Sequence, residues 1–161
     1  MVTSSSIPAE NIWSILNQVT DPEVPVLTIT DLGIVRDVNI TGNEIEIIIT
    51  PTYTGCPAMD MIAMHIKLAL LENGYKNIKV TSVLSPAWTT DWMSEEGKMK
   101  LKEYGIAPPY NRSDDTAKPI INCPQCNSSN IKLISEFGST ACKALYQCND
   151  CKEPFDYFKC H

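Results

Sequence analysis

Apolar residues near the N-terminus recur at intervals of three and four positions, which predicts an amphipathic helix. Ser6 is the expected N-cap, and Pro8 suits the opening turn. The proline-bearing stretch DPEVP at 21–25 should end the helix, because proline lacks a backbone donor. The apolar positions of this helix are Ile12, Ile15, Leu16 and Val19.

Two runs of alternating polarity follow, and each predicts a β-strand. Thr41-Gly42-Asn43 lies between the runs, so the pair is predicted to be a hairpin. In the first run, Ile34, Arg36, Val38 and Ile40 share one face of the strand, and in the second run Ile45, Ile47 and Ile49 share one.

The segment from Ala58 to Asn73 is apolar nearly all round, which predicts a helix that lies across a sheet. Gly74 is the expected C-cap, and NIKVTSVL at 77–84 reads as a third strand. The order helix-strand-strand-helix-strand predicts a small α+β sandwich in which the helices cover one face of the sheet.

A shorter helix is marked at both ends. Ser94 is its predicted N-cap, Glu95 and Glu96 occupy its first turn, and Gly105 ends it. Residues 109–119 are polar and contain proline, as a linker does. The chain is therefore predicted to have a first domain at 7–108, a linker at 109–119 and a separate module at 120–161.

Charge and hydropathy exclude several classes of protein. The net charge is −6 and no basic stripe is present, which disfavours binding to nucleic acid or to an anionic membrane. No apolar run approaches the roughly 20 residues that span a bilayer, and the N-terminus does not have the pattern of a signal peptide. We therefore expect a cytoplasmic protein. In a reducing cytosol, its seven cysteines are better read as metal ligands or reactive thiols than as disulfides.

Two CxxC pairs stand in the C-terminal module, at Cys123 and Cys126 and at Cys148 and Cys151, with 21 residues between them. Four thiolates from two tight turns complete a tetrahedron around zinc, and a rubredoxin-like iron site is the alternative. A module of about 40 residues needs such ligation for stability. Because no position is left open for water, we expect a structural staple or a docking surface rather than a catalytic metal.

Three further metal-binding side chains lie near the C-terminus: Cys142, Cys160 and His161. A surplus cysteine is often buried and inert. The alternative is that these three residues form a second, exchangeable metal site.

Cys56 lies apart from the other cysteines, between Gly55 and Pro57, at the Ncap or N′ position of the second predicted helix. Backbone donors and the positive end of the helix dipole favour a thiolate there. The cysteine is therefore either a nucleophilic or metal-binding thiolate, or a small residue that fills a gap in the core. His65 lies nine residues further on and away from the helix start, so a Cys–His hydrolase has little support.

Acidic residues cluster in the loop before the first strand, at Asp21, Glu23 and Asp31. Carboxylates can assist a thiolate–metal site from outside its ligand shell, and they also form turns and caps. The sequence has no Gly-rich phosphate loop and no Ser-His-Asp set, so no standard enzyme signature is present. A Cys56 enzyme acting on a coenzyme A thioester is a further alternative that lacks a general base.

The stretches DPEVPVLTITDLGIV (21–35), TPTYTGCPAMDMI (50–62) and LSPAWTTDWMSEEGKMKLKEYGIAPP (84–109) together resemble the iron–sulfur assembly domain of SufT-like and related cytosolic assembly factors. With the tail FGSTACKALYQCNDCKEPFDYFKCH (137–161), the chain is similar to the PaaD-like family, which is encoded with the phenylacetyl-CoA epoxidase of bacterial phenylacetate catabolism. The resemblance covers nearly the whole chain from about Asn11.

This resemblance implies a maturation factor, rather than an enzyme, that helps assemble, deliver or repair an iron–sulfur or iron centre of the epoxidase. The family's reactive cysteine falls on Cys56, its acidic turn on Asp21 and Glu23, and its Pro-x-Trp segment on Pro86 and Trp88. The implied partners are the epoxidase subunits or their reductase and other iron–sulfur assembly proteins. The family's zinc-ribbon ligands fall on Cys123, Cys126, Cys148 and Cys151.

In the resulting hypothesis, the Cys56 thiolate holds iron or a labile cluster. One thiol cannot coordinate a cluster alone, so further ligands must come from Cys142, the terminal Cys-His pair, a small thiol or a second copy of the chain. A homodimer that brings two Cys56 residues together is the simplest arrangement. Trp88 and Trp92 either shield the site or pack in the core. The alternative function is a zinc-stapled adaptor that docks the oxygenase without handling iron.

Overall fold

The structure is a computed structural model that describes residues 7–109 and 120–159. The chain forms two compact units, residues 1–88 and residues 89–161. The predicted cap Ser6, the linker residues from 110 to 119, and Cys160 and His161 lie outside the described residues. Within the described part, no helix has the length and apolar character to span a bilayer.

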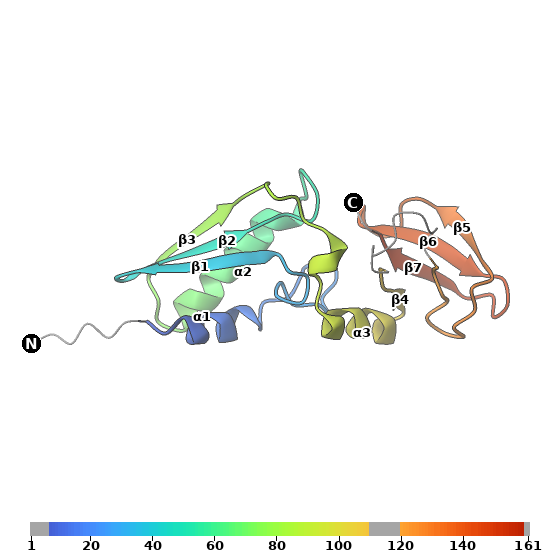
Figure 1. Ribbon diagram of the computed structural model, residues 1–161, viewed down its shortest axis with the longest axis horizontal. Helices are drawn as coiled ribbons and strands as arrows, with labels where there is room; N and C mark the ends of the chain where they lie inside the picture. Colours follow the sequence, from blue (N-terminus) through green and yellow to red (C-terminus); the bar gives the residue numbers. More distant parts are fainter. Residues whose placement is uncertain (1–6, 110–119, 160–161) are drawn as a thin grey trace, which may run out of the picture. The chain divides into compact units, whose positions relative to one another are not determined.

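The first unit has the predicted order of elements, in a sheet of three strands with the order β1-β2-β3. Strands β1 and β2 are antiparallel, whereas β2 and β3 are parallel and are connected through α2. Both helices lie on the same side of the sheet (Figure 1). The elements are α1 (Ala9–Leu16), β1 (Val35–Thr41), β2 (Glu44–Ile49), α2 (Ala58–Glu72) and β3 (Asn77–Ser82).

The core of this unit lies between the sheet and the helices. Strand β2 alternates as predicted, with Ile45, Ile47 and Ile49 buried. Helix α1 is shorter than predicted, because it ends at Leu16 with Asn17 as its C-cap, and Val19 is buried outside the helix. Pro8 is the N-cap rather than a first-turn residue. The buried positions of α2 are Ala58, Ile62, Ile66 and Leu70.

Strand β1 departs from the predicted alternation at its start. Val35 pairs with Ile49 but Asp37 pairs with Ile48, so a β-bulge inserts one extra residue. The bulge places Val35 in the core and leaves Arg36 exposed. The prediction that Arg36 shares a face with the inward residues Val38 and Ile40 was therefore wrong.

The turns of the first unit are those that its glycines predict. Gly42, in the β1–β2 hairpin, has a φ of 62°, and Gly74, directly after the C-cap Asn73 of α2, has a φ of 91°. Both values lie in the left-handed region that favours glycine. The predicted hairpin is confirmed, whereas α2 ends at Glu72, one residue earlier than predicted, with Asn73 rather than Gly74 as its C-cap.

The second unit carries a four-stranded sheet with the order β4-β7-β6-β5, in which the β4–β7 pair is parallel and the other two pairs are antiparallel. Because β4 pairs with β7, both α3 and β4 group with the second unit, whereas the sequence pattern placed them in the domain at 7–108. The elements are the 3₁₀ turn η1 (Thr90–Trp92), α3 (Glu95–Tyr104), β4 (Ile106–Ala107), β5 (Ile131–Ser135), β6 (Lys143–Cys148) and β7 (Pro154–Phe158).

Helix α3 forms as its sequence predicts. The Ser94 hydroxyl accepts a hydrogen bond from the Gly97 N–H at 2.9 Å, and Glu95 and Glu96 lie in the first turn. Gly105 is the C-cap with a φ of 93°. The small core beside this helix contains Ala107, Ile121, Phe155 and Tyr157 together with the sulfurs of two buried cysteines.

Candidate functional site

Four cysteines of the second unit converge from two turns. Cys123 and Cys126 belong to the loop before β5, Cys148 ends β6, and Cys151 lies in the turn that leads to β7. Their four sulfur atoms all lie within 4.8 Å of one another. The Sγ atoms of Cys123 and Cys151 are 3.7 Å apart, and those of Cys126 and Cys148 are 3.5 Å apart.

This sulfur cluster fits one tetrahedral metal ion. Zinc–thiolate bonds of about 2.3 Å place neighbouring sulfurs about 3.8 Å apart in a regular tetrahedron. Both sulfur–sulfur separations given above are close to that value, so the cysteine side chains need to move little to bind an ion. Cys123 and Cys148 are completely buried, while Cys126 and Cys151 face the solvent. The donor set suits zinc and also suits iron.

The two turns that hold the cysteines are built alike. The residue after the second cysteine of each pair has a positive φ, 61° at Asn127 and 67° at Lys152. The Cys123 N–H donates to the Ser128 carbonyl and the Cys148 N–H donates to the Glu153 carbonyl, each at 2.9 Å. A left-handed lysine is strained, so the geometry of the second turn is maintained by its surroundings.

A polar network joins the two turns, and the sequence pattern did not predict it. The Asp150 carboxylate accepts hydrogen bonds from the Ser128 hydroxyl and, at 3.0 Å, from the Asn130 amide. The Asn149 amide in turn donates to the Asn130 side-chain oxygen at 3.0 Å. The bond from Ser128 is the main cause that lowers the pKa of Asp150. The sequence signal was a group of short polar side chains beside each CxxC pair.

The sulfurs differ in how readily they ionise. Backbone N–H groups of Cys151 and Asp150, together with the nearby thiols, lower the pKa of Cys148 to about 7. At Cys151, a backbone hydrogen bond from Glu153 favours the thiolate, but burial and the three neighbouring thiols raise the pKa to about 12. Without a cation, four close sulfurs cannot all be ionised, and metal binding displaces the protons that remain.

Cys142 lies outside this cluster. It is buried just before β6, and its Sγ lies 2.9 Å from the Thr140 hydroxyl. Its carbonyl accepts a hydrogen bond from the Lys159 N–H at 3.1 Å. The second metal site predicted for Cys142 with Cys160 and His161 falls partly outside the described residues and stays a prediction.

Cys56 occupies the N′ position of α2, directly before the N-cap Pro57. It is half-buried, its N–H donates to the Tyr53 carbonyl at 3.3 Å, and its carbonyl accepts from the Met59 N–H at 3.3 Å. Gly55 has a φ of 79°, and no atom lies within 4 Å of the position that a Cβ would take. The loop therefore places the cysteine at the helix start, directly after a glycine whose side-chain position is open.

Thr50 stands at the beginning of the same loop. Its backbone N–H donates to the Ile34 carbonyl at 2.9 Å. Its hydroxyl is buried and has no hydrogen-bond partner within residues 7–109 and 120–159. A buried polar atom without a partner is uncommon in folded proteins.

The acidic loop is organised by its own carboxylates. Asp21 is buried, and its Oδ1 accepts hydrogen bonds from the N–H groups of Glu23 and Val24, each at 2.8 Å. Asp31 accepts from the Thr28 N–H at 3.1 Å. These bonds are those of turn-forming residues, which was one of the two interpretations of the sequence. Glu23 is half-buried.

The tryptophan of the Pro-x-Trp segment is a core residue. Trp88 is 4% exposed, and its Nε1 donates to the Leu32 carbonyl at 2.7 Å. It thereby fixes the loop that contains Asp31. Pro86 is exposed and follows a cis peptide bond. Trp92 is half-buried in the second unit.

Among the described residues, His, Cys, Asp or Glu side chains come close enough to share one metal ion at the sulfur quartet, the four Sγ atoms of Cys123, Cys126, Cys148 and Cys151. Cys56, Asp21 and Glu23 do not form such a group. An iron ion or a cluster at Cys56 would therefore need ligands beyond these three residues.

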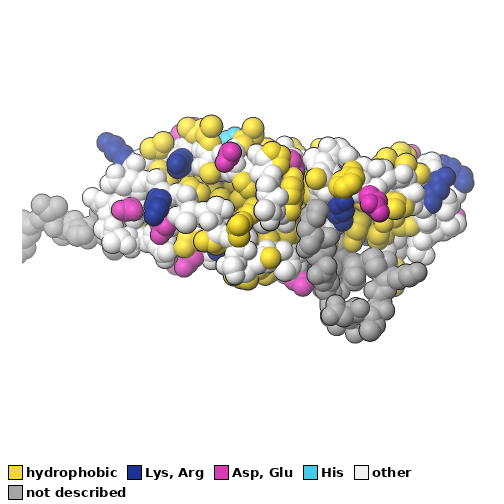
Figure 2. Space-filling model, turned by 90° about the horizontal axis from the view of Figure 1, so that it is seen from above, with side chains coloured by type: hydrophobic (Ala, Val, Ile, Leu, Met, Phe, Trp, Pro, Cys, Tyr) yellow, Lys and Arg dark blue, Asp and Glu magenta, His cyan; other side chains and the backbone are white. Residues whose placement is uncertain are grey.

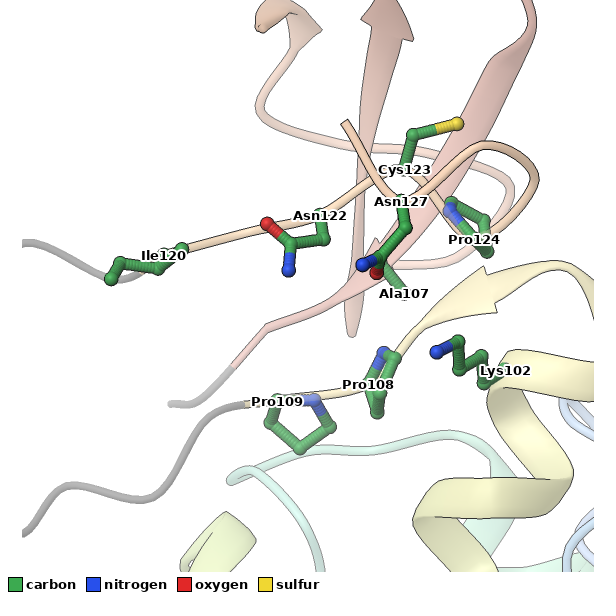
Figure 3. Close-up of a pocket in the computed structure, with 9 residues that line it drawn as sticks. All are labelled: Lys102, Ala107, Pro108, Pro109, Ile120, Asn122, Cys123, Pro124 and Asn127. Atoms are coloured by element: carbon green, nitrogen blue, oxygen red, sulfur yellow. The ribbon is translucent and has the colours of Figure 1, made fainter. Parts of the chain in front are cut away.

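A hollow of about 220 Å³ lies next to the first cysteine turn (Figure 3). It is lined by Lys102 of α3, Pro108, and the amide side chains of Asn122 and Asn127. In Figure 3 the sulfur of Cys123 points away from the other lining side chains, so the hollow gives no separate access to the sulfur quartet.

Two family models match the chain. The PaaD zinc beta ribbon domain matches residues 107–159, and an iron–sulfur cluster assembly protein model matches residues 9–84. The sulfur quartet lies inside the first match and Cys56 lies inside the second.

Individual proteins agree with these matches. The chain is 50% identical, over 99% of its length and 98% of the other's, to an Escherichia coli protein named as a candidate component of 1,2-phenylacetyl-CoA epoxidase. It is 39% identical to the Fe-S protein maturation auxiliary factor YitW of Bacillus subtilis, over 57% of this chain and 91% of that protein. The crystal structure of a DUF59 domain from Bacillus anthracis matches with a TM-score of 0.54 and 33% identity, over 57% of this chain and 89% of that one. The predicted fold class and the resemblance drawn from the sequence are confirmed.

Proposed function

Because the chain belongs to the PaaD-like family of iron–sulfur assembly proteins, we propose that it helps assemble, deliver or repair the iron–sulfur or iron centre of a phenylacetyl-CoA epoxidase complex. Its partners are the epoxidase subunits or their reductase. The named roles of the Escherichia coli and Bacillus subtilis relatives support this proposal, one through the epoxidase and the other through iron–sulfur maturation.

Cys56 is the residue that handles the iron cargo. The observation that carries this assignment is its placement at the start of α2, half-buried beside a glycine with open space above it. A thiolate is the form of cysteine that binds iron.

Asp21 and Glu23 contribute by positioning rather than by binding iron. The Asp21 carboxylate holds the turn that contains Glu23 and Val24. The Trp88 ring holds the adjacent loop through the Leu32 carbonyl. Both interactions keep the acidic loop in one conformation.

The second unit is a zinc ribbon in this proposal. Cys123, Cys126, Cys148 and Cys151 would hold one zinc ion, which supplies a structural cross-link between the two turns. Since all four positions are thiols, the ion has no open coordination site for a reaction. The ribbon thus stabilises a surface through which the factor contacts its client.

Co-production of the epoxidase with variants of this chain tests the proposal. We expect Cys56→Ser to reduce the iron content of the epoxidase, and its turnover of phenylacetyl-CoA, to the level seen without the factor. Thr54→Ala, at an exposed position of the same loop, is the matched control and should keep both. Full iron incorporation with Cys56→Ser would refute the carrier role.

The adaptor function remains the second candidate, and a surface of the ribbon favours it. Leu133, Ile134 and Phe137 are each about half exposed or more, on β5 and the turn that follows it. Neighbouring exposed apolar residues of this kind often mark a protein contact. An adaptor predicts that Cys56→Ser supports full epoxidase activity, whereas Phe137→Glu abolishes association with the complex.

A further inference from the structure

Helix α2 has two apolar faces. One face is buried in the first unit and carries Ala58, Ile62, Ile66 and Leu70. At 100° per residue, a second set of large apolar residues lies on nearly the opposite side of the helix. These residues are Met61, Met64, Leu68 and Leu71, with exposed fractions of 49%, 59%, 48% and 48%. We call them the outer stripe.

Figure 2 shows hydrophobic side chains at the surface of the first unit, some of them beside a histidine. The spacing of the outer stripe is three, four and three residues, which is the a and d pattern of a coiled-coil seam over two heptads. A helix that packs only against its own sheet needs no such second stripe. The pattern therefore indicates a helical partner.

The residues beside the stripe suggest which partner. Asp60 and Lys67 occupy the g positions, and His65 and Glu72 occupy the e positions. In a parallel pair of identical helices, each g residue faces the e residue five positions later in the other helix. Asp60 would face the second copy's His65, and Lys67 would face the second copy's Glu72.

These flanking side chains are available for such contacts. Within the described part of the chain, none of the four takes part in an ion pair or a side-chain hydrogen bond. An antiparallel pair would instead bring the two g-position lysines near each other. The charges are thus self-complementary in the parallel orientation.

We propose that two copies of this chain associate through the outer stripe of α2, with the two helices parallel and in register. A consequence concerns Cys56. Parallel helices start at the same end, so the two Cys56 residues would lie at the same end of the helix pair. In an antiparallel pair centred on the outer stripe they would lie at opposite ends, about 30 Å apart along the helix axis.

The parallel dimer would therefore place a second thiol at the same end as the first, and a shared iron or cluster requires more than one thiol. This consequence rests on the proposed function, but the association itself does not. The tests below use protein without iron, so their outcome is separate from that of the maturation experiments.

Sedimentation equilibrium of the full zinc-loaded chain tests the association. We expect a monomer–dimer equilibrium in which Met64→Glu or Leu68→Glu raises the dissociation constant by about tenfold or more. Leu84→Glu, at a residue that is 61% exposed outside the stripe, should leave it unchanged. Circular dichroism verifies that each variant is folded. A wild type that stays monomeric at every concentration would overturn the proposal and leave the stripe to another protein, and stripe variants that dimerise as well as wild type would also overturn it.

Charge exchange and cross-linking test the orientation. Lys67→Glu and Glu72→Lys should each weaken the dimer, and the double variant should restore it. A short bis-maleimide should link Cys56 to the second copy's Cys56, as mass spectrometry of the linked peptides would show, and Cys56→Ser should abolish that product. Unchanged single variants, or a dimer that yields no Cys56–Cys56 link, would contradict the parallel arrangement.

Discussion

Two substitutions of Asp21 separate its role as a hydrogen-bond acceptor in the turn from the role of its negative charge. The Asp21 carboxylate accepts two backbone hydrogen bonds, from Glu23 and from Val24, both at 2.8 Å, in a buried position. Alanine removes the acceptor, so the N–H groups of Glu23 and Val24 lose their hydrogen bonds to it. Asparagine keeps an oxygen at the same place but removes the negative charge.

The expected cost follows from these bonds. A hydrogen bond to a charged group contributes about 1.5–3 kcal/mol, and part of that loss is recovered where water reaches the donor, as at half-buried Glu23. Asp21→Ala should therefore lower the free energy of unfolding of the first unit by about 2–4 kcal/mol. Asp21→Asn should lower it by about 1 kcal/mol, because the neutral bonds are weaker but still formed.

Urea unfolding followed by tryptophan fluorescence measures both values. A Trp92→Phe background removes the tryptophan of the second unit, so Trp13 and Trp88 report on the first unit alone. If the carboxylate only forms the turn, Asp21→Asn should keep epoxidase maturation nearly intact. The reasoning is refuted if Asp21→Ala is as stable as wild type, or if Asp21→Asn abolishes maturation while the fold is kept.

Three further outcomes are expected. Trp88→Phe removes the donor to the Leu32 carbonyl and should destabilise the first unit by about 1–3 kcal/mol in the same urea assay. Chelation of the metal should unfold the second unit and leave the first folded. The near-ultraviolet circular dichroism of Tyr146 and Tyr157, whose rings lie 5.9 Å apart, should then be lost. Retained dichroism would contradict a metal-dependent ribbon. Gly55→Ala should lower the free energy of unfolding by about 1 kcal/mol through its positive φ alone, because space for the methyl group is free. It should impair maturation of the epoxidase more than Gly42→Ala, which introduces a similar positive-φ strain in the hairpin.

Local signals in the sequence predicted local structure well. The helix from Ser94 to Gly105 has an N-cap, acidic first turn and left-handed C-cap that each depend on neighbouring residues only. The CxxC turns are equally local, and their convergence follows from the demand of a metal for four ligands.

Features that depend on distant residues were not predictable in this way. The bulge at Val35–Asp37 reflects pairing with β2, and the β4–β7 pair joins segments that are about 50 residues apart in the chain. The uniform apolar character of α2 indicated burial but not which side is buried. Only the packing of Ile62, Ile66 and Leu70 distinguishes the inner face from the exposed outer stripe.

The candidate site was predicted unevenly for the same reason. Cys56 at the helix start was read correctly from Gly55 and Pro57. The hydrogen bond from Trp88 to the Leu32 carbonyl and the partnerless Thr50 hydroxyl required the tertiary structure. Sequence spacing reveals where a side chain stands along the chain, but not which atoms from other elements it meets.

The central claim is that the Cys56 thiolate holds iron or a labile cluster. Anaerobic reconstitution of the purified protein with iron and sulfide, followed by elemental analysis beside Cys56→Ser, tests it directly. We predict equal zinc in both proteins, with iron and sulfide retained only by wild type. Equal iron in both proteins, or none in either, would contradict the claim.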